Sequence, residues 1–126
     1  MEKPLILFVD DEHDVLASIK SGLEARDYTV LVASSGKEAL KMLAASKPRL
    51  MIIDLRMEPM NGFELYQEMR KDSRLGKMPV FFLTAVDDSL ARKHGQKLGV
   101  AAYITKPVDI HDLDLRIRKT LSEHPA

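Results

Sequence analysis

The chain has 126 residues, the usual length of one folded domain, and its 45% hydrophobic and 30% charged residues are typical of globular proteins. Its 19 basic and 19 acidic residues balance, so there is no basic excess of the kind that accompanies direct nucleic-acid binding, and it has no cysteine for disulfides or thiolate metal sites. No apolar run approaches the roughly 20 residues of a membrane span, and no secretory signal is visible. We therefore expect a single cytoplasmic domain over residues 1–126, with its core at about residues 4–122.

Short apolar runs alternate along the chain with longer segments of helical periodicity. Three of the runs, "LILFV", "LMII" and "VFFL", are apolar without alternation, which is typical of strands that are covered on both faces of a parallel sheet. The five predicted strands are Leu5–Val9, Thr29–Ala33, Leu50–Ile53, Val80–Leu83 and Ala101–Thr105.

A helix is predicted after each strand. In the first helix, Val15, Ile19 and Leu23 recur at helical spacing. In the second, Ser35 is a predicted N-cap, and Glu38 completes a capping box. The remaining helices are predicted at about 63–71, 88–98 and 110–121. This alternation predicts an α/β fold, a doubly wound (βα)5 sandwich of three layers with a parallel sheet and right-handed crossovers.

Polar residues follow four of the predicted strands. They are Asp10 and Asp11 after the first, Asp54 after the third, Thr84 after the fourth and Lys106 after the fifth. Each alone has an ordinary interpretation as a loop acid, a helix cap or a solvated lysine, but ligands of such sheets bind at the carboxyl ends of the strands. Carboxylates without histidine or cysteine suit Mg²⁺ or Mn²⁺, and an aspartate neutralised by the metal can attack a phosphoryl group.

The chain resembles the receiver domain of two-component response regulators, the CheY-like fold, over essentially its whole length. The matching segments, in the order and spacing of the family, are "VDDE" at 9–12, "IIDLRM" at 52–57, "NGFEL" at 61–65, "PVFFLTA" at 79–85 and "YITKP" at 103–107. The resemblance implies the strand order 2-1-3-4-5, with Asp54 as the phosphoacceptor. It also implies Mg²⁺ ligation by Asp10, Asp11 and Asp54, most directly by Asp11, and by the backbone carbonyl of Arg56.

The same resemblance assigns roles around the phosphoacceptor. Thr84 and Lys106 become phosphoryl ligands, and Thr84 and Tyr103 become the switch residues. The Lys106–Pro107 peptide bond is expected to be cis, although Pro107 also fits a plain helix start. Glu12, by contrast, is expected to be a solvated residue at the start of the first helix.

Two positions beside the site are typical regulators of phosphoryl lifetime in such proteins. They are Arg56, two residues after Asp54, and Val86, two residues after Thr84. Valine does not orient water, and the arginine side chain is long enough to cover a phosphoryl group. The hypothesis is therefore slow autodephosphorylation, against the alternative that both are neutral surface residues.

The resemblance implies a phosphorylation-dependent signalling switch. The expected donor is the phosphohistidine of a sensor histidine kinase or a phosphotransfer protein. The expected output is a change of the face formed by 88–98, 101–105 and 110–121, which is read by a downstream protein, an effector domain or a second copy. Such a chain catalyses its own phosphorylation and dephosphorylation and is not expected to turn over a separate substrate. The alternative is a phosphorylation-independent pseudo-receiver that acts as a protein-interaction module.

Overall fold

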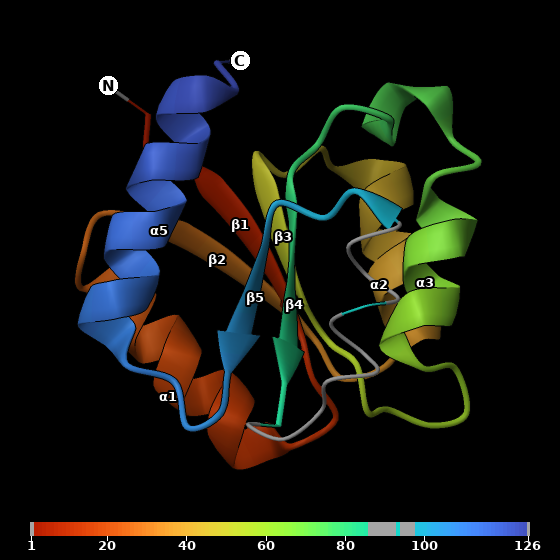
Figure 1. Ribbon diagram of the computed structural model, residues 1–126, viewed down its shortest axis with the longest axis horizontal. Coiled ribbons are helices and arrows are strands. Elements are labelled where there is room, and N and C mark those ends of the chain that lie inside the picture. The colour runs from red at the N-terminus through yellow and green to blue at the C-terminus, as the bar shows by residue number, and fades with distance from the viewer. Residues whose placement is uncertain (1, 86–92, 94–97, 126) are drawn as a thin grey trace.

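The computed structural model describes residues 2–85, 93 and 98–125 (Figure 1). Apart from residues 93 and 98, the helix predicted at 88–98 lies outside this described part, and so does Val86. The described chain forms one parallel sheet of five strands in the order β2-β1-β3-β4-β5, with helices between the strands. The predicted fold class and strand order are confirmed.

The strands lie close to their predicted bounds. β1 (Leu5–Val9) and β2 (Thr29–Ala33) match them, and β5 (Ala102–Thr105) begins one residue later than predicted. β3 (Leu50–Asp54) and β4 (Val80–Thr84) each extend one residue further, because the ladder continues with Asp54 opposite Leu83 and Thr84 opposite Thr105. Asp54 and Thr84 are therefore the last residues of their strands, held by the sheet itself.

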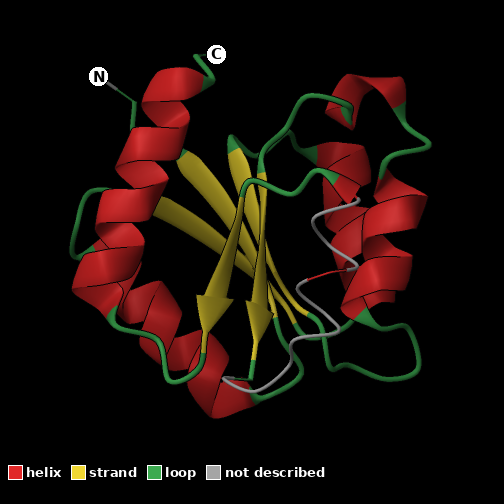
Figure 2. Cartoon of the chain, in the orientation of Figure 1, coloured by secondary structure: helices red, strands yellow, loops and turns green. Residues whose placement is uncertain are grey.

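The described helices cover both faces of the sheet and make three layers (Figure 2). α1 (His13–Glu24) and α5 (Ile110–Glu123) lie on one face, while α2 (Gly36–Ala45) and α3 (Gly62–Met69) lie on the other (Figure 1). A short 3₁₀ turn, Ser73–Leu75, lies between α3 and β4. No helix among the described residues is long and apolar enough to cross a membrane.

The helix caps differ in one detail from the prediction. Ser35 is the N-cap of α2 and accepts from the Glu38 N–H at 3.1 Å, as predicted. The Glu38 carboxylate, however, accepts from the Ser34 N–H at 3.2 Å, one residue further back, so the predicted reciprocal capping box does not form there. A complete capping box starts α3, where Asn61 and Glu64 each accept from the other's backbone N–H.

The core divides between the two faces of the sheet. Successive residues of β1 alternate, so that Leu7 and Val9 pack toward α2 and α3, whereas Ile6 and Phe8 pack toward α1 and α5. All four side chains are fully buried. Because both faces are covered, β1, β3 and β4 are apolar at every position before Asp54 and Thr84, which explains the unbroken apolar runs of the sequence.

Candidate functional site

The sheet brings the predicted site residues to one edge, at the carboxyl ends of β1, β3, β4 and β5. The Asp10 N–H continues the ladder by donating to the Ala33 carbonyl at 3.1 Å. The Lys106 N–H donates to the Thr84 carbonyl at 2.8 Å, so this lysine starts from a fixed point beside β4. The positions of these side chains therefore depend on the sheet rather than on flexible loops.

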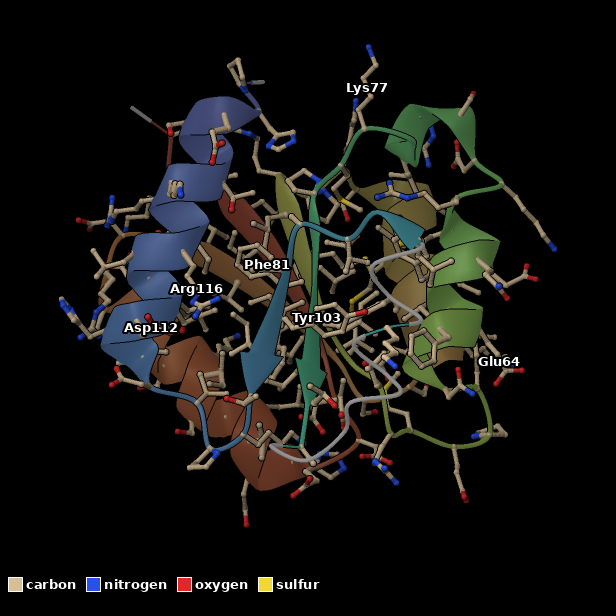
Figure 3. The ribbon with its side chains drawn as sticks, in the orientation of Figure 1. Glu64, Lys77, Phe81, Tyr103, Asp112 and Arg116 are labelled. Carbon is tan, nitrogen blue, oxygen red and sulfur yellow. The ribbon has the colours of Figure 1, made fainter. Side chains whose placement is uncertain are left out.

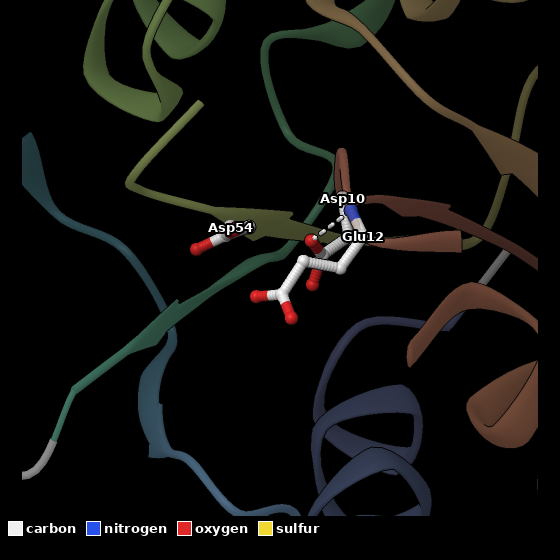
Figure 4. Close-up of side chains that lie close together, drawn as sticks. All are labelled: Asp10, Glu12 and Asp54. Atoms are coloured by element: carbon white, nitrogen blue, oxygen red, sulfur yellow. Dashed lines mark hydrogen bonds between the residues drawn. The ribbon is translucent and has the colours of Figure 1, made fainter. Parts of the chain in front are cut away.

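Three carboxylates gather at this edge (Figure 4). Asp10, Glu12 and Asp54 each place an oxygen within 4.8 Å of the other two. Asp10 is fully buried and Asp54 is 3% exposed, whereas Glu12 is exposed. Two backbone groups orient the buried pair: the Glu12 N–H donates to Asp10 Oδ1 at 3.0 Å, and the Arg56 N–H donates to Asp54 Oδ1 at 3.2 Å.

Lys106 balances these carboxylates. Its Nζ lies 3.0 Å from Glu12 Oε1, 3.3 Å from Asp10 Oδ2 and 3.4 Å from Asp54 Oδ2. The Asp10 oxygen is close enough for an ion pair but makes no hydrogen bond of good geometry. The Lys106–Pro107 peptide bond is cis, as the resemblance implied.

The electrostatics of the site shift two pKa values. Burial, and then the negative charge of Asp10, raise the pKa of Asp54 from 3.8 to about 6, even though the Arg56 N–H and the Lys106 charge act in the opposite direction. For Lys106, burial favours the neutral amine, but the hydrogen bond that its ammonium donates to Glu12 and the charges of Asp54 and Asp10 outweigh this effect and raise the pKa of Lys106 to about 12. Lys106 is therefore a permanent cation at neutral pH.

The Thr84 hydroxyl has no hydrogen-bond partner in the described part of the chain. Thr84 is 1% exposed, and its Oγ1 is buried without a donor or acceptor within reach among the described residues. A buried hydroxyl without a partner costs roughly 1–3 kcal/mol, so such groups are rare in folded proteins. An incoming ligand oxygen at the edge of the sheet would satisfy it.

Asp11 and Arg56 lie beside the buried acids and not among them. Both are exposed, and both line a hollow of about 490 Å³ that Glu58 and Asn61 also border. Glu12 takes the third position in the carboxylate group instead. Sequence reasoning assigned Glu12 to solvent, because its contact with Lys106 joins residues 94 positions apart and no local pattern announces it.

The predicted switch aromatic, Tyr103, packs against the sheet core (Figure 3). It is half-buried, and its ring lies edge-to-face on Phe82, with the centroids 5.8 Å apart. Phe82 in turn contacts the rings of Phe63 and Tyr66, at 5.3 and 5.5 Å. Tyr103 is therefore connected to α3 through buried aromatic rings.

Comparison with known proteins agrees with this arrangement. Residues 6–118 match the response regulator receiver domain. The chain belongs to that family. Its fold also matches a solved response regulator receiver domain protein (CheY-like) from Methanospirillum hungatei, at 30% identity and a TM-score of 0.88, over 97% of this chain and 96% of the other.

Two similar curated proteins are longer and are named as transcriptional regulators. The transcriptional regulatory protein CrdR of Helicobacter pylori is 32% identical over 99% of this chain and 58% of its own length. The alkaline phosphatase synthesis transcriptional regulatory protein PhoP of Bacillus subtilis is 33% identical over 92% of this chain and 48% of its own length. The receiver domain thus spans about half the length of these relatives.

Proposed function

We propose that this receiver domain is a switch that accepts a phosphoryl group on Asp54. The observation that carries the proposal is the environment of that carboxylate. It is buried, it lies 3.4 Å from the Lys106 ammonium, and it shares the sheet edge with the Thr84 hydroxyl, which has no hydrogen-bond partner among the described residues. A nucleophile, a cation and a vacant hydrogen-bond donor at one edge are what phosphoryl transfer needs.

The donor set suits a hard divalent cation. Asp10 and Asp54 would hold Mg²⁺ or Mn²⁺ from the buried side, and Glu12, Asp11 and the Arg56 carbonyl are the candidate ligands on the open side. The bound cation would supply charge neutralisation for the carboxylates and a ligand site for a phosphoryl oxygen. Lys106, which now neutralises the same carboxylates, would then bind the transferred group.

The transfer itself needs no general base. An Asp54 carboxylate oxygen attacks the phosphorus of a phosphohistidine, a P–O bond forms, and the P–N bond breaks with its electron pair leaving on the imidazole nitrogen. Above its pKa of about 6, Asp54 is already the ionised nucleophile. The Thr84 hydroxyl donates to one phosphoryl oxygen, and the Lys106 ammonium stabilises another.

A receiver of two-component signalling implies a kinase as its partner, here a sensor histidine kinase directly or a phosphotransfer protein. We propose that the output passes through Thr84 and Tyr103 to the face formed by residues 88–98, β5 and α5, as a shift between two pre-existing states. A downstream protein, an effector domain or a second copy would read that face. The relatives' names, which describe transcriptional regulators, favour an output of that kind.

Incubation of the protein with acetyl phosphate and Mg²⁺ tests the proposal. Intact-mass measurement should find one added phosphoryl group on the native chain and none on Asp54→Asn. Asp14→Asn is the matched control, because Asp14 is an exposed acid in the first turn of α1 and should leave the modification unchanged. Modification of Asp54→Asn to the native extent would refute the assignment.

Beryllofluoride separates the switch from a pseudo-receiver. With Mg²⁺ it should shift the amide resonances of Tyr103 and α5 in the native chain and leave those of Asp54→Asn in place. An unchanged spectrum of the native chain, together with no phosphorylation, would favour the phosphorylation-independent interaction module.

A further inference from the structure

The end of the sheet opposite the phosphoacceptor carries a hollow rich in basic side chains. It encloses about 300 Å³ and is bordered by the segments before β3 and β4 and by the end of α5. Figure 3 shows Lys77 at this end of the molecule, away from the arrowheads of the strands. We call it the basic hollow and define it by its basic residues, Lys47, Arg49, Arg74, Lys77 and His124.

The charge of the basic hollow is not balanced locally. No aspartate or glutamate is among the described residues that line it, although the whole chain has equal numbers of acids and bases. Lys47, Arg49 and Lys77 make no ion pair with any described residue. Arg74 differs, because Asp72 neutralises it through an ion pair of 2.8 Å. Three cations therefore line the hollow without a counter-charge among the residues that the structure describes.

Two of the basic groups are held in place before any ligand arrives. The Arg74 guanidinium donates to Asp72 and to the Leu43 carbonyl, the latter at 3.0 Å. Arg49 is half-buried, and one of its terminal nitrogens lies 3.5 Å from the His124 carbonyl at the end of α5. A guanidinium held in this way matches phosphate oxygens at a smaller entropy cost than a free lysine.

The remaining wall of the basic hollow is apolar. Pro48, Met78 and Pro79 line it and are themselves buried. A cationic rim around an apolar wall suits a ligand with an anionic part and a flat or apolar part. The volume of the hollow, about 300 Å³, suits a small metabolite rather than a polymer. Proline and methionine side chains pack well against a planar ring.

We propose that the basic hollow binds a small molecule that carries two or more linked phosphate groups and an apolar body, of which a nucleoside diphosphate is the simplest representative. Several uncompensated cations favour a diphosphate over a monophosphate because each additional anionic charge adds to the attraction. The apolar wall favours a nucleotide over bare pyrophosphate. The proposal does not depend on phosphorylation of Asp54, since it uses none of the residues at that edge.

Calorimetric titration of the 126-residue chain tests it, in EDTA and at about 0.15 M salt so that long-range attraction is screened. The probes are ADP, pyrophosphate, AMP and adenosine. We expect ADP to bind most tightly, pyrophosphate and AMP each about tenfold or more weaker, and adenosine without measurable heat. Equal affinity for all the anions, or no binding of ADP at millimolar concentration, would overturn the proposal.

A charge-matched pair of variants locates the ligand. Replacing Lys47, Arg49 and Lys77 together by glutamine should weaken ADP binding by about tenfold or more, equivalent to about 1.4 kcal/mol. The control replaces three exposed lysines elsewhere by glutamine, which removes the same net charge. It should change the affinity by less than about twofold, because none of the three lines the basic hollow. These control positions are Lys37, Lys41 and Lys119.

Two further measurements keep the result decisive. ADP should shift the amide resonances of Lys77 and Met78 in the native chain, which requires no variant to fold. Asp54→Asn should bind ADP as the native chain does, whatever its phosphorylation. Loss of ADP binding in Asp54→Asn, equal weakening in both triple variants, or tighter binding of a short oligonucleotide than of ADP would each refute the proposal.

Discussion

Asp54→Asn should make the folded protein more stable above about pH 6. The pKa of Asp54 rises from 3.8 to about 6 in the folded state, so folding favours the protonated acid and opposes the ionised one. Below about pH 4 the group is protonated in both states and imposes no penalty. The penalty develops between about pH 4 and pH 6 and is complete above it, where asparagine, which never ionises, avoids it.

The magnitude follows from the shift. A rise of about two pKa units corresponds to about 3 kcal/mol of free energy of unfolding, which is an upper value because water at the sheet edge screens the charges. Urea unfolding followed by far-UV circular dichroism measures it, since the chain has no tryptophan. We expect a gain of about 2–3 kcal/mol at about pH 8 and little difference at about pH 4.

Two controls make this test specific. Asp14→Asn removes an exposed acid and should leave the free energy of unfolding unchanged at both pH values. Mg²⁺ should stabilise the native chain at about pH 8, by about 1.4 kcal/mol at ten times its dissociation constant, and stabilise Asp54→Asn less. An asparagine variant that is no more stable than the native chain at about pH 8, or that gains equally at about pH 4, would refute the reasoning.

Three further changes have expected outcomes. In urea titrations, Lys106→Met should lower the free energy of unfolding by about 2 kcal/mol at about pH 8, and by less at about pH 4, where Asp54 is protonated. An equal loss of stability at the two pH values would contradict this prediction. Gly62→Ala should lower the free energy of unfolding by about 2 kcal/mol and slow acetyl-phosphate labelling, because the added Cβ would lie 2.6 Å from the Asp54 carbonyl oxygen. Gly76→Ala should do neither, because the atom nearest to its added Cβ lies 3.5 Å away. Val86→Glu should accelerate phosphoryl loss, measured by intact mass after removal of the donor, if the expected slow autodephosphorylation holds.

The sequence predicted the sheet well, for a physical reason. Strands buried on both faces must be apolar at every position, so their runs stand out against the mixed composition of the helices. The predicted helix starts were also close, because Ser35 and Asp109 both cap through their own side chains. The predicted reciprocal hydrogen bond of Glu38 was wrong, since a carboxylate reaches either of two neighbouring N–H groups and local sequence does not decide between them.

The sequence predicted which strand ends meet at the candidate site, but not the contacts among the side chains there. Strand ends at one edge brought Asp10, Asp54, Thr84 and Lys106 together, as the parallel fold requires. The ion pair of Glu12 with Lys106 was missed, because an exposed acid at a helix start has a sufficient local explanation. The prediction that Asp11 contacts the metal more directly than Asp10 stays a prediction. The structure adds that Asp10 is fully buried, whereas Asp11 is exposed.

The basic hollow was invisible in the sequence for a similar reason. Its lysines and arginines come from two segments that are far apart along the chain, residues 47–49 and 74–77, and each is an ordinary exposed or half-exposed cation. Only the fold gathers them at the amino ends of β3 and β4, while the acids gather at the carboxyl ends. A net charge of zero thus conceals a protein with an acidic end and a basic end.

The two ends should nevertheless act independently. Arg49 and Asp54 are separated by the length of β3, which is 5 residues and therefore about 16 Å. At an effective dielectric near 20, the interaction energy of one such charge with Asp54 is about 1 kcal/mol over that distance. The distance is about two Debye lengths at 0.15 M salt, so screening reduces this energy to about 0.1–0.2 kcal/mol.

The glutamine variant of Lys47, Arg49 and Lys77 tests this independence. Its three lost charges together should raise the pKa of Asp54 by less than about half a unit, because 1 unit corresponds to about 1.4 kcal/mol. Titration of the Asp54 carboxyl resonance by NMR measures the shift in the native chain and in the variant, at low salt and at about 0.15 M. A rise in the pKa of Asp54 of about one unit or more at the higher salt would mean that the field of these charges passes through the low-dielectric sheet rather than through solvent. Ligand binding at the basic end would then alter the pKa of the nucleophile at the acidic end.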